Sequence, residues 1–427
     1  MNFCDIITYI IFLAEFFMTN IAIIGFGVVG GGITEVIRLN KKAIMRAIGA
    51  EINVKYILDL RDFPDSPYAD RVVHDFSVIL NDPDVKVVCE TMGGVNPAFD
   101  YSMQALRSGK SVVTSNKELV ANRGVELMAE AKKNCVSYMF EASAGGGIPE
   151  IRSMRTSFGG DTITEIDGIL NGTTNYILTK MKNEGADFAD VLKEAQQLGY
   201  AEANPSADVD GIDAQRKIVI LTAIATNKLA SCDDVYTETM TKVSPADMDA
   251  AARWGGTVKL LGSSRIDHEN GKASIFVCPT FVPSSCPLAH IDDVYNGIRI
   301  NSPVTNDYML YGRGAGRMPT AGAVVSDVVS ILSGVGAKEL PMEWEHAEAD
   351  FVLPFDENEF SYYVRIKADA VDETVEKAKL VFGDVQLING SPAGYVEFVT
   401  AKITEKDAKA AFEAGALGEV ESRIRVM

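Results

Sequence analysis

The sequence predicts a multidomain α/β protein, and three observations carry this prediction. The chain has 427 residues, more than one hydrophobic core usually accommodates. In residues 18–143, apolar runs typical of buried strands alternate with helical segments, which is the pattern of βαβ units and a parallel sheet. In residues 358–427, strands and helices follow the order βαββαβ, which is the ferredoxin-like arrangement.

The first domain, residues 18–143, is expected to consist of alternating strands and helices. The expected strands are 21–25, 52–58, 85–90, 111–114 and 138–141. The expected helices are 28–48, 97–108 and 118–133. Gly109 is a stop signal for the second of these helices.

Past Gly145 the pattern changes to mixed strands and helices, and we assign residues 144–311 to a second domain. Its expected elements are a strand at 162–170, helices at 171–182, 188–198 and 213–227, a polar loop at 200–211 and two strands that flank the turn 268–272. A glycine-rich loop and an apolar helix follow, and we expect residues 312–340 to complete the first domain. The acidic segment 340–358 lacks clear periodicity and is interpreted as a linker to the third domain, residues 358–427.

Composition excludes several classes of function. Lys and Arg number 40 against 59 Asp and Glu, so the formal net charge is −19, and no basic stripe is present to bind nucleic acid. The six cysteines and four histidines form neither a C-x-x-C nor an H-E-x-x-H pattern, so the sequence indicates no disulfide framework and no zinc site.

The N-terminal residues 6–17 are largely apolar and could be mistaken for a signal sequence. Asp5 and Glu15 interrupt them, no Lys or Arg precedes them, and no small-residue cleavage site follows. The stretch is also too short to span a bilayer. We favour Met18 as the true start; a short leader helix is the alternative. We expect a cytoplasmic protein without a membrane partner.

The first chemical motif is Gly25-Phe-Gly-Val-Val-Gly30, which follows a strand and begins a helix. This is the context that the dinucleotide-binding fingerprint of a Rossmann domain requires. Gly25 allows the tight turn, Gly27 allows the pyrophosphate to approach, and Gly30 allows helix and strand to pack closely. The helix N-terminus offers amide donors to the phosphates. The motif therefore predicts NAD or NADP binding.

Two residues after the second strand give opposite indications of the cofactor. Asp59 is placed where an acid binds the ribose 2′-hydroxyl of NAD. Arg61 could instead pair with the 2′-phosphate of NADP. Both could also be solvated loop charges, so the choice stays open. Thr91, directly after the strand 85–90, is expected to lie at the same sheet edge and contact the cofactor.

Two further segments could meet a ligand. Lys117 follows the strand 111–114, at the edge of a parallel sheet where ligands bind; the alternative is a surface lysine at a helix start. The segment from Glu141 to Pro149 contains three consecutive glycines, which bring bare carbonyls and amides within reach of a ligand or ion or form a hinge.

The most informative stretch runs from Gly199 to Lys217. Asp213 and Lys217 are four residues apart and share a helix face. Such a pair is most often a stabilising contact, but this helix continues as an apolar run and should be buried. A desolvated lysine suits acid–base work near neutrality. Glu202 and Asp208 supply carboxylates suited to an α-ammonium group.

A second glycine loop, from Tyr311 to Thr320, leads into an apolar helix with Pro319 in its first turn. It could close over the cofactor or simply form a tight loop.

Taken together, these segments resemble homoserine dehydrogenases. The segments that carry the resemblance are GFGVVGGG, VVTSNK, FEASAGGGIP, GILNGTTNYIL, LGYAEANPSADVDGIDAQRK and YGRGAGRMPTAGAVVSD. They occur in order over roughly residues 19–335. The resemblance implies NAD(P)-dependent interconversion of L-aspartate 4-semialdehyde and L-homoserine, in threonine, methionine and isoleucine biosynthesis. It also implies that the second domain is a mixed α/β substrate-binding and dimerisation domain in a homodimer or homotetramer.

The resemblance also implies roles for single residues. Lys217 resembles the general acid/base, with Asp213 as its partner, and Lys117 resembles a second active-site lysine. Glu202, Asp208 and Asp213 match substrate-binding acids. The expected cofactor contacts are Gly25, Phe26, Gly27, Val28, Val29, Gly30, Asp59, Arg61, Thr91, Lys117, Gly314 and Gly316. The positions that match a structural sodium site in relatives are Glu141, Ala144, Gly146 and Ile148.

The C-terminal βαββαβ domain resembles an ACT domain, a regulatory unit. After its first strand the chain reads Lys367-Ala-Asp-Ala-Val-Asp-Glu373 instead of an Asp-x-Pro-Gly type of turn, so binding of threonine or another effector stays open. Two other functions are alternatives: a related Rossmann dehydrogenase of another small amino alcohol, and a nucleotide-binding sensor without catalysis. Aspartate-semialdehyde dehydrogenase is disfavoured because no cysteine lies in an electropositive loop with a partner histidine.

Overall fold

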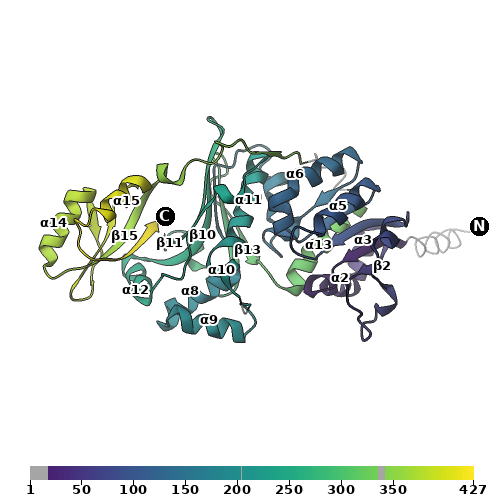
Figure 1. Cartoon of the computed structure of the whole chain (residues 1–427), viewed down its shortest axis with the longest axis horizontal. Helices are drawn as coiled ribbons and strands as arrows, with labels where there is room; N and C mark the ends of the chain where they lie inside the picture. The colour runs from purple at the N-terminus through teal and green to yellow at the C-terminus, as the bar shows by residue number, and fades with distance from the viewer. Residues whose placement is uncertain (1–17, 203, 335–341) are drawn as a thin grey trace, which may run out of the picture. The chain divides into compact units, whose positions relative to one another are not determined.

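The computed structural model describes residues 18–202, 204–334 and 342–427 (Figure 1). The question of a start at Met18 concerns residues 1–17, which lie outside the described residues. The chain forms two compact units: residues 1–157, 223–229 and 313–346 make the first, and residues 158–222, 230–312 and 347–427 make the second. The three domain boundaries proposed from the sequence stay a prediction.

The first unit contains a parallel sheet of the doubly wound type. Its strands are β1 (Met18–Ile24), β2 (Glu51–Leu58), β3 (Val72–Val73), β4 (Val85–Glu90), β5 (Ser111–Thr114) and β6 (Tyr138–Met139). Their order in the sheet is β3-β2-β1-β4-β5-β6, and every pair is parallel. This is the strand order of a dinucleotide-binding Rossmann domain, as the sequence predicts.

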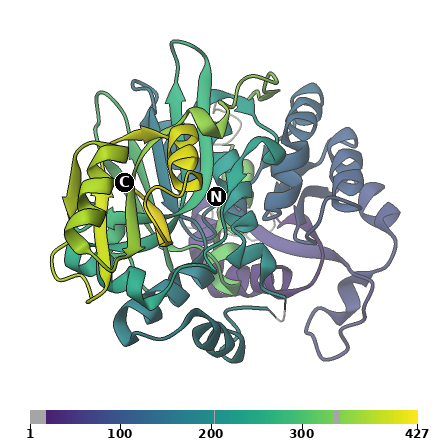
Figure 2. The same cartoon turned by 60° about the vertical axis from the view of Figure 1, so that its left-hand side comes forward.

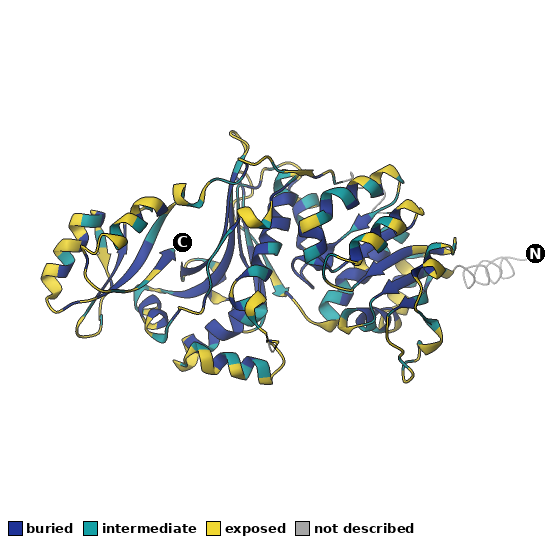
Figure 3. Ribbon diagram, viewed as in Figure 1, coloured by how far each residue is buried: buried dark blue, intermediate teal, exposed yellow. Residues whose placement is uncertain are grey.

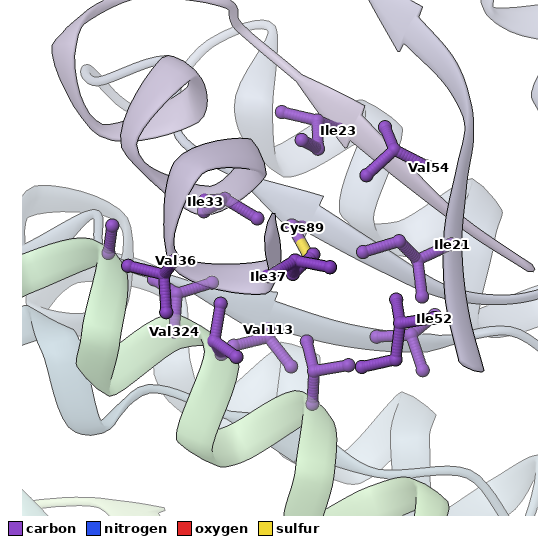
Figure 4. Close-up of a cluster of buried hydrophobic side chains, with 14 of the residues drawn as sticks. Ile21, Ile23, Ile33, Val36, Ile37, Ile52, Val54, Cys89, Val113 and Val324 are labelled. Atoms are coloured by element: carbon purple, nitrogen blue, oxygen red, sulfur yellow. The ribbon is translucent and has the colours of Figure 1, made fainter. Parts of the chain in front are cut away.

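Helices cover this sheet (Figure 1). The helices of this unit are α2 (Val28–Leu39), α3 (Lys41–Ile48), α4 (Phe76–Leu80), α5 (Ala98–Arg107), α6 (Lys117–Lys133), α7 (Glu150–Ser157) and α13 (Arg317–Leu332). The buried faces of β1, β2, β4, α2 and α13 form one apolar cluster, in which Figure 4 labels Ile21, Ile33 and Val324 among other residues. α13 comes from far along the chain and packs directly on α2.

Two predictions in this unit are wrong in detail. The helix predicted at 28–48 is two helices, because Asn40 interrupts it and its side-chain amide donates to the carbonyl of Val36. The strand predicted at 138–141 ends at Met139. Glu141 instead begins a 3₁₀ turn, and its backbone N–H donates to Asp327 of α13, which draws the chain out of the sheet.

The second unit is built on a mixed sheet that continues to the C-terminus (Figure 2). Its strand order is β13-β12-β7-β10-β11-β19-β15-β17-β16. The strands of the first part are β7 (Glu165–Ile169), β9 (Tyr236–Thr237), β10 (Gly256–Asp267), β11 (Lys272–Pro283), β12 (Tyr295–Asn301) and β13 (Tyr308–Arg313). β10 and β11 form the predicted hairpin and are buried along most of their length (Figure 3).

The helices of this part are α8 (Gly172–Glu184), α9 (Phe188–Gln197), α10 (Ser206–Val209), α11 (Ile212–Thr226) and α12 (Pro245–Trp254). The last residues of α11, from Ala223, belong to the first unit together with β8 (Lys228–Leu229). The predicted strand at 162–170 is shorter than expected. α10 lies in the segment predicted as a polar loop, where Pro205 accepts backbone bonds from Asp208 and Val209.

The C-terminal part has the predicted βαββαβ order with one short extra strand, β18, before its second helix. Its elements are β15 (Glu359–Lys367), α14 (Val371–Phe382), β16 (Val385–Leu387), β17 (Tyr395–Thr400), β18 (Ile403–Thr404), α15 (Glu405–Glu413) and β19 (Val420–Val426). The antiparallel order β19-β15-β17-β16 is that of a ferredoxin-like sheet. β19 also pairs with β11 in parallel, so one sheet runs through the whole unit.

The described part of the segment predicted as a linker begins at residue 342. It contains β14 (Glu345–His346) and a 3₁₀ turn at 355–357, and it buries Trp344 and Phe351. Residues 335–341, which hold its first residues and the end of the predicted 312–340 segment, lie outside the described residues.

Candidate active site

The glycine fingerprint forms a closely packed turn between β1 and α2. Gly25 has a φ of +90°, and a Cβ there would lie 2.9 Å from the carbonyl oxygen of Thr91. A Cβ on Gly30 would lie 2.1 Å from the carbonyl oxygen of Gly25. At Gly27 nothing lies within 4 Å of a Cβ position, so this side of the turn is open. The turn therefore provides the backbone cradle and the helix N-terminus that a dinucleotide pyrophosphate requires.

Thr91 and Asp59 hold this turn in place. The Thr91 hydroxyl donates to the carbonyl of Gly25 at 2.7 Å, and the Asp59 carboxylate accepts the N–H of Phe26 at 2.8 Å. The Arg61 guanidinium donates two hydrogen bonds of 3.0 Å to the Asp59 carboxylate. The hydrogen bonds from Arg61 lower the pKa of Asp59 to about 2. Asp59 and Arg61, which gave opposite indications of the cofactor in the sequence, thus form an ion pair in the structure.

The two glycine loops pack on each other within the first unit. A Cβ on Gly146 would lie 2.3 Å from the carbonyl oxygen of Gly314, and a Cβ on Gly147 would lie 2.7 Å from Pro319. The Gly147 N–H donates to Arg313 at 3.0 Å. This close approach is a structural reason for glycine at 146 and 147. Contact of Gly314 and Gly316 with the cofactor stays a prediction.

Glu141 uses its carboxylate to hold the start of α7. Its Oε1 and Oε2 atoms accept the backbone N–H groups of Ile151 and Arg152 at 2.8 and 2.9 Å. Burial raises the pKa of Glu141. The carbonyl of Ile148 accepts the N–H of Glu150. Sodium binding by backbone oxygens of Glu141, Ala144, Gly146 and Ile148 stays a prediction. Among the residues that the structure describes, no cluster of three or more His, Cys, Asp or Glu could hold a metal ion.

Lys117 begins α6, directly after Asn116. The Asn116 Oδ1 atom accepts the N–H of Leu119, which caps the helix, and its Nδ2 atom donates to the carbonyl of Gly94 at 2.6 Å. The buried Glu90 lies at the same sheet edge and accepts the hydroxyl of Thr114 at 2.5 Å. Lys117 is half-buried there. The same sheet edge thus carries Lys117 after β5 and the glycine fingerprint after β1, with β4 between these strands.

In the second unit, Lys217 and Asp213 form a buried ion pair on α11. The Lys217 Nζ atom lies 2.7 Å from Asp213 Oδ2 and 2.7 Å from the carbonyl oxygen of Leu170, at the end of β7. Both side chains are less than a tenth exposed. The i, i+4 spacing on one helix face brings them together, as predicted.

Asn171 extends this pair to Asp208. Its Nδ2 atom donates to Asp208 Oδ1 at 2.7 Å and to Asp213 Oδ2 at 2.9 Å. Asp208 lies on α10, so residues far apart in sequence form one polar network of Lys217, Asp213, Asn171 and Asp208. Such a network can hold a proton on an amine and offers carboxylates to a cationic group.

Comparisons with known proteins agree with this geometry. Residues 25–141 match the family model described as "Homoserine dehydrogenase, NAD binding domain", and residues 149–329 match the model described as "Homoserine dehydrogenase". The homoserine dehydrogenase of Synechocystis sp. is 36% identical and covers 96% of this chain and 99% of its own length. That of Neisseria gonorrhoeae is 39% identical, with 82% of each chain covered.

The chain belongs to the homoserine dehydrogenase family. A solved homoserine dehydrogenase from Thiobacillus denitrificans matches it with a TM-score of 0.86 and 33% identity, over 96% of this chain and 99% of that one. A hyperthermophilic archaeal homoserine dehydrogenase mutant in complex with NADPH matches with a TM-score of 0.62 and 28% identity, over 74% and 97%. The chain is thus an NAD(P)-dependent oxidoreductase with homoserine dehydrogenase activity on a small-molecule substrate, and neither alternative function is favoured.

The sequence missed Asn171 as a member of the site. Asn171 lies in the segment GILNGTTNYIL, on which the resemblance depends. From sequence alone, an asparagine before a helix is interpreted as a simple N-cap. Glu202 is exposed in the loop after α9, with its backbone carbonyl bound to Gln196, and its role toward substrate stays a prediction. Of the helices in the described residues, none is long and apolar enough to cross a membrane. The described cysteines are free thiols.

Proposed function

We propose that Lys217 is the general acid and base of the homoserine dehydrogenase reaction and that Asp213 is its partner. The observation that carries this proposal is the buried 2.7 Å contact between Lys217 and Asp213. Two of the three N–H groups of the ammonium point to Asp213 and to the Leu170 carbonyl. The third is then directed to the oxygen of the substrate.

The reaction needs one hydride and one proton. When bound, the nicotinamide cofactor supplies or accepts the hydride. In the reductive direction, the carbonyl oxygen of L-aspartate 4-semialdehyde gains negative charge, and Lys217 donates the proton that turns it into the hydroxyl of L-homoserine. In the oxidative direction, the neutral amine of Lys217 accepts that proton. Lys117 is proposed as a second cation that stabilises the reacting oxygen.

The substrate also carries an α-ammonium group, which requires carboxylates. We assign this role to Asp208 and Glu202, and Asp213 shares it. Support comes from Asp208, whose carboxylate is held beside Asp213 by the same asparagine amide. A homodimer or homotetramer is part of this proposal, as is a place in threonine, methionine and isoleucine biosynthesis.

The fingerprint turn, Thr91 and the start of α2 are proposed to hold the cofactor. Asp59 and Arg61 are proposed to decide between NAD and NADP. The side chain of Asp59 is 9% exposed and that of Arg61 is 64% exposed. Because Arg61 alone extends well into solvent, it is the residue that can reach a 2′-phosphate, while Asp59 holds the turn.

The decisive experiment measures initial rates of nicotinamide reduction with L-homoserine, with NAD⁺ and with NADP⁺, on the wild type and on Lys217→Ala. We expect kcat to fall by about 10²- to 10⁴-fold, as for loss of a general acid/base, with an unchanged Kd for the cofactor. Lys193→Ala, an exposed lysine of α9, is the control and should keep full turnover.

Two results would contradict the proposal. If cofactor affinity falls as much as kcat, Lys217 is not the acid/base. If the wild type binds cofactor but does not oxidise L-homoserine, the substrate is another small amino alcohol.

A further inference from the structure

The side chain of Asn171 joins the two carboxylates of the proposed site. We infer that Asn171 is a positioning residue: its amide holds Asp208 and Asp213 as a fixed pair and thereby orients Lys217. This inference rests on the proposed function, because it concerns the residues to which that function assigns roles.

The contacts determine how the amide is oriented. The Asn171 Oδ1 atom accepts the backbone N–H of Thr174 at 2.9 Å, which caps α8. The Nδ2 atom then faces the two carboxylates, and each of its two N–H groups serves one of them. The reverse orientation would place Oδ1 against two carboxylate oxygens and is therefore excluded. With 6% of its surface exposed, Asn171 has little room for another arrangement.

The amide has a specific electrostatic task. The charged groups of the network are Asp208 on α10 and Asp213 and Lys217 on α11. Two carboxylates side by side repel each other, and donors between them offset that repulsion. Asn171 donates to both without adding a charge, so it holds Asp213 toward Lys217 and keeps Asp208 beside it.

The neighbouring residue completes the arrangement. The carbonyl of Leu170 accepts from Lys217 at 2.7 Å, and Asp213 Oδ2 accepts from both Lys217 and Asn171. The end of β7 therefore holds the ammonium by its backbone and the partner carboxylate by its next side chain. Because a strand end is rigid, the direction of the remaining Lys217 N–H depends on residues 170 and 171.

Two variants separate positioning from helix capping. Serine is as good an N-cap as asparagine but cannot donate to two carboxylates, so Asn171→Ser keeps the cap and breaks the bridge. Asn171→Ala loses both. Thr404→Ala, which removes the cap of α15 in the same unit, is the matched control for cap loss. For each protein, kcat and KM for L-homoserine, the Kd for the cofactor, thermal unfolding and the pH dependence of kcat/KM are measured.

For Asn171→Ser we expect kcat/KM for L-homoserine to fall by about ten- to a hundredfold, as for a lost hydrogen bond to a charged group. The cofactor Kd should be retained, and the Tm should fall less than in Asn171→Ala because the helix cap is kept. The acid limb of kcat/KM should move to higher pH by roughly half a unit or more, because the carboxylates have lost donors. Asn171→Ala should lose the same activity and also Tm, and Thr404→Ala should lose Tm alone.

The inference is overturned if Asn171→Ser has wild-type kcat/KM and pH profile, or if activity falls only as far as the folded fraction does. In that case Asn171 is a helix cap, and the role of Lys217 is untouched as long as Lys217→Ala is inactive. An inactive wild type would instead remove the proposed function itself.

Discussion

Two strand–helix junctions, one in each unit, use asparagine in the same way and to different ends. At the start of α6, Asn116 caps the helix through Oδ1 and donates from Nδ2 to the backbone carbonyl of Gly94. At the start of α8, Asn171 caps the helix through Oδ1 and donates from Nδ2 to Asp208 and Asp213. The Oδ1 cap stabilises each helix. The partners of the Nδ2 donor determine whether the junction holds a loop or a pair of carboxylates.

The difference lies in the partners of the donor: the Gly94 carbonyl and the single Glu90 carboxyl for Asn116, and two carboxylates for Asn171. A donor on a backbone carbonyl fixes the course of a loop, here the turn after β4 that lies next to the glycine fingerprint. A donor on two carboxylates sets charge and direction in a site for chemistry. We therefore propose that the same residue at the same position of a helix supports cofactor binding in one unit and proton transfer in the other.

Among variants of the first unit, the largest expected effect comes from Asn116→Ser. Serine keeps the cap of α6 but loses the bond to Gly94, so the turn after β4 is no longer held. We expect the KM for the cofactor to rise about tenfold or more, as for loss of a buried hydrogen bond. The KM for L-homoserine should stay within about twofold, the reverse of Asn171→Ser. Steady-state kinetics in both substrates tests this, and equal changes for both variants would refute the division of roles.

A smaller effect should appear at the cofactor's ribose. Arg61→Ala removes the exposed guanidinium and leaves Asp59 bound to Phe26. If Arg61 binds the 2′-phosphate, the ratio of kcat/KM for NADP⁺ to that for NAD⁺ should fall by about tenfold, the value of one charge-assisted hydrogen bond. The rate with saturating NAD⁺ should be unchanged. An unchanged ratio would indicate that Asp59, and not Arg61, determines the preference between NAD and NADP.

The smallest effect concerns the buried acid of the α6 junction. Burial raises the pKa of Glu90 above its usual value. The native protein therefore holds this proton more tightly than the unfolded chain, and the stability that results is complete below about pH 4.5 and lost as pH rises through the raised pKa. Each pH unit within that window costs about 1.4 kcal/mol.

Glu90→Gln cannot ionise and should remove this part of the pH dependence. Its free energy of unfolding, relative to that of the wild type, should increase as pH rises above about 4.5. Urea unfolding at several pH values measures the difference. A constant difference across pH would show that the raised pKa does not affect folding.

Much of this protein followed from local patterns in its sequence. The glycines of the fingerprint, the i, i+4 pair of Asp213 and Lys217, and the alternation of strands and helices depend on neighbours in the chain, and these predictions agree with the structure. The break at Asn40 was missed because the residues on both sides of it have the apolar spacing of one helix.

The tertiary structure decided which distant residues meet. Asn171 and Asp213 are 42 residues apart, and no local period connects them, so the bridge exists only because β7 ends beside the start of α11. In the same way, Asp59 and Arg61 gave opposite indications of the cofactor as separate residues, whereas the structure joins them in one ion pair and leaves only Arg61 extended into solvent. Sequence determined the residue types and their local geometry, because backbone preferences and helical periods are short-ranged. Packing determined which residues interact, because hydrogen bonds between side chains depend on the positions of the strands and helices in the tertiary structure.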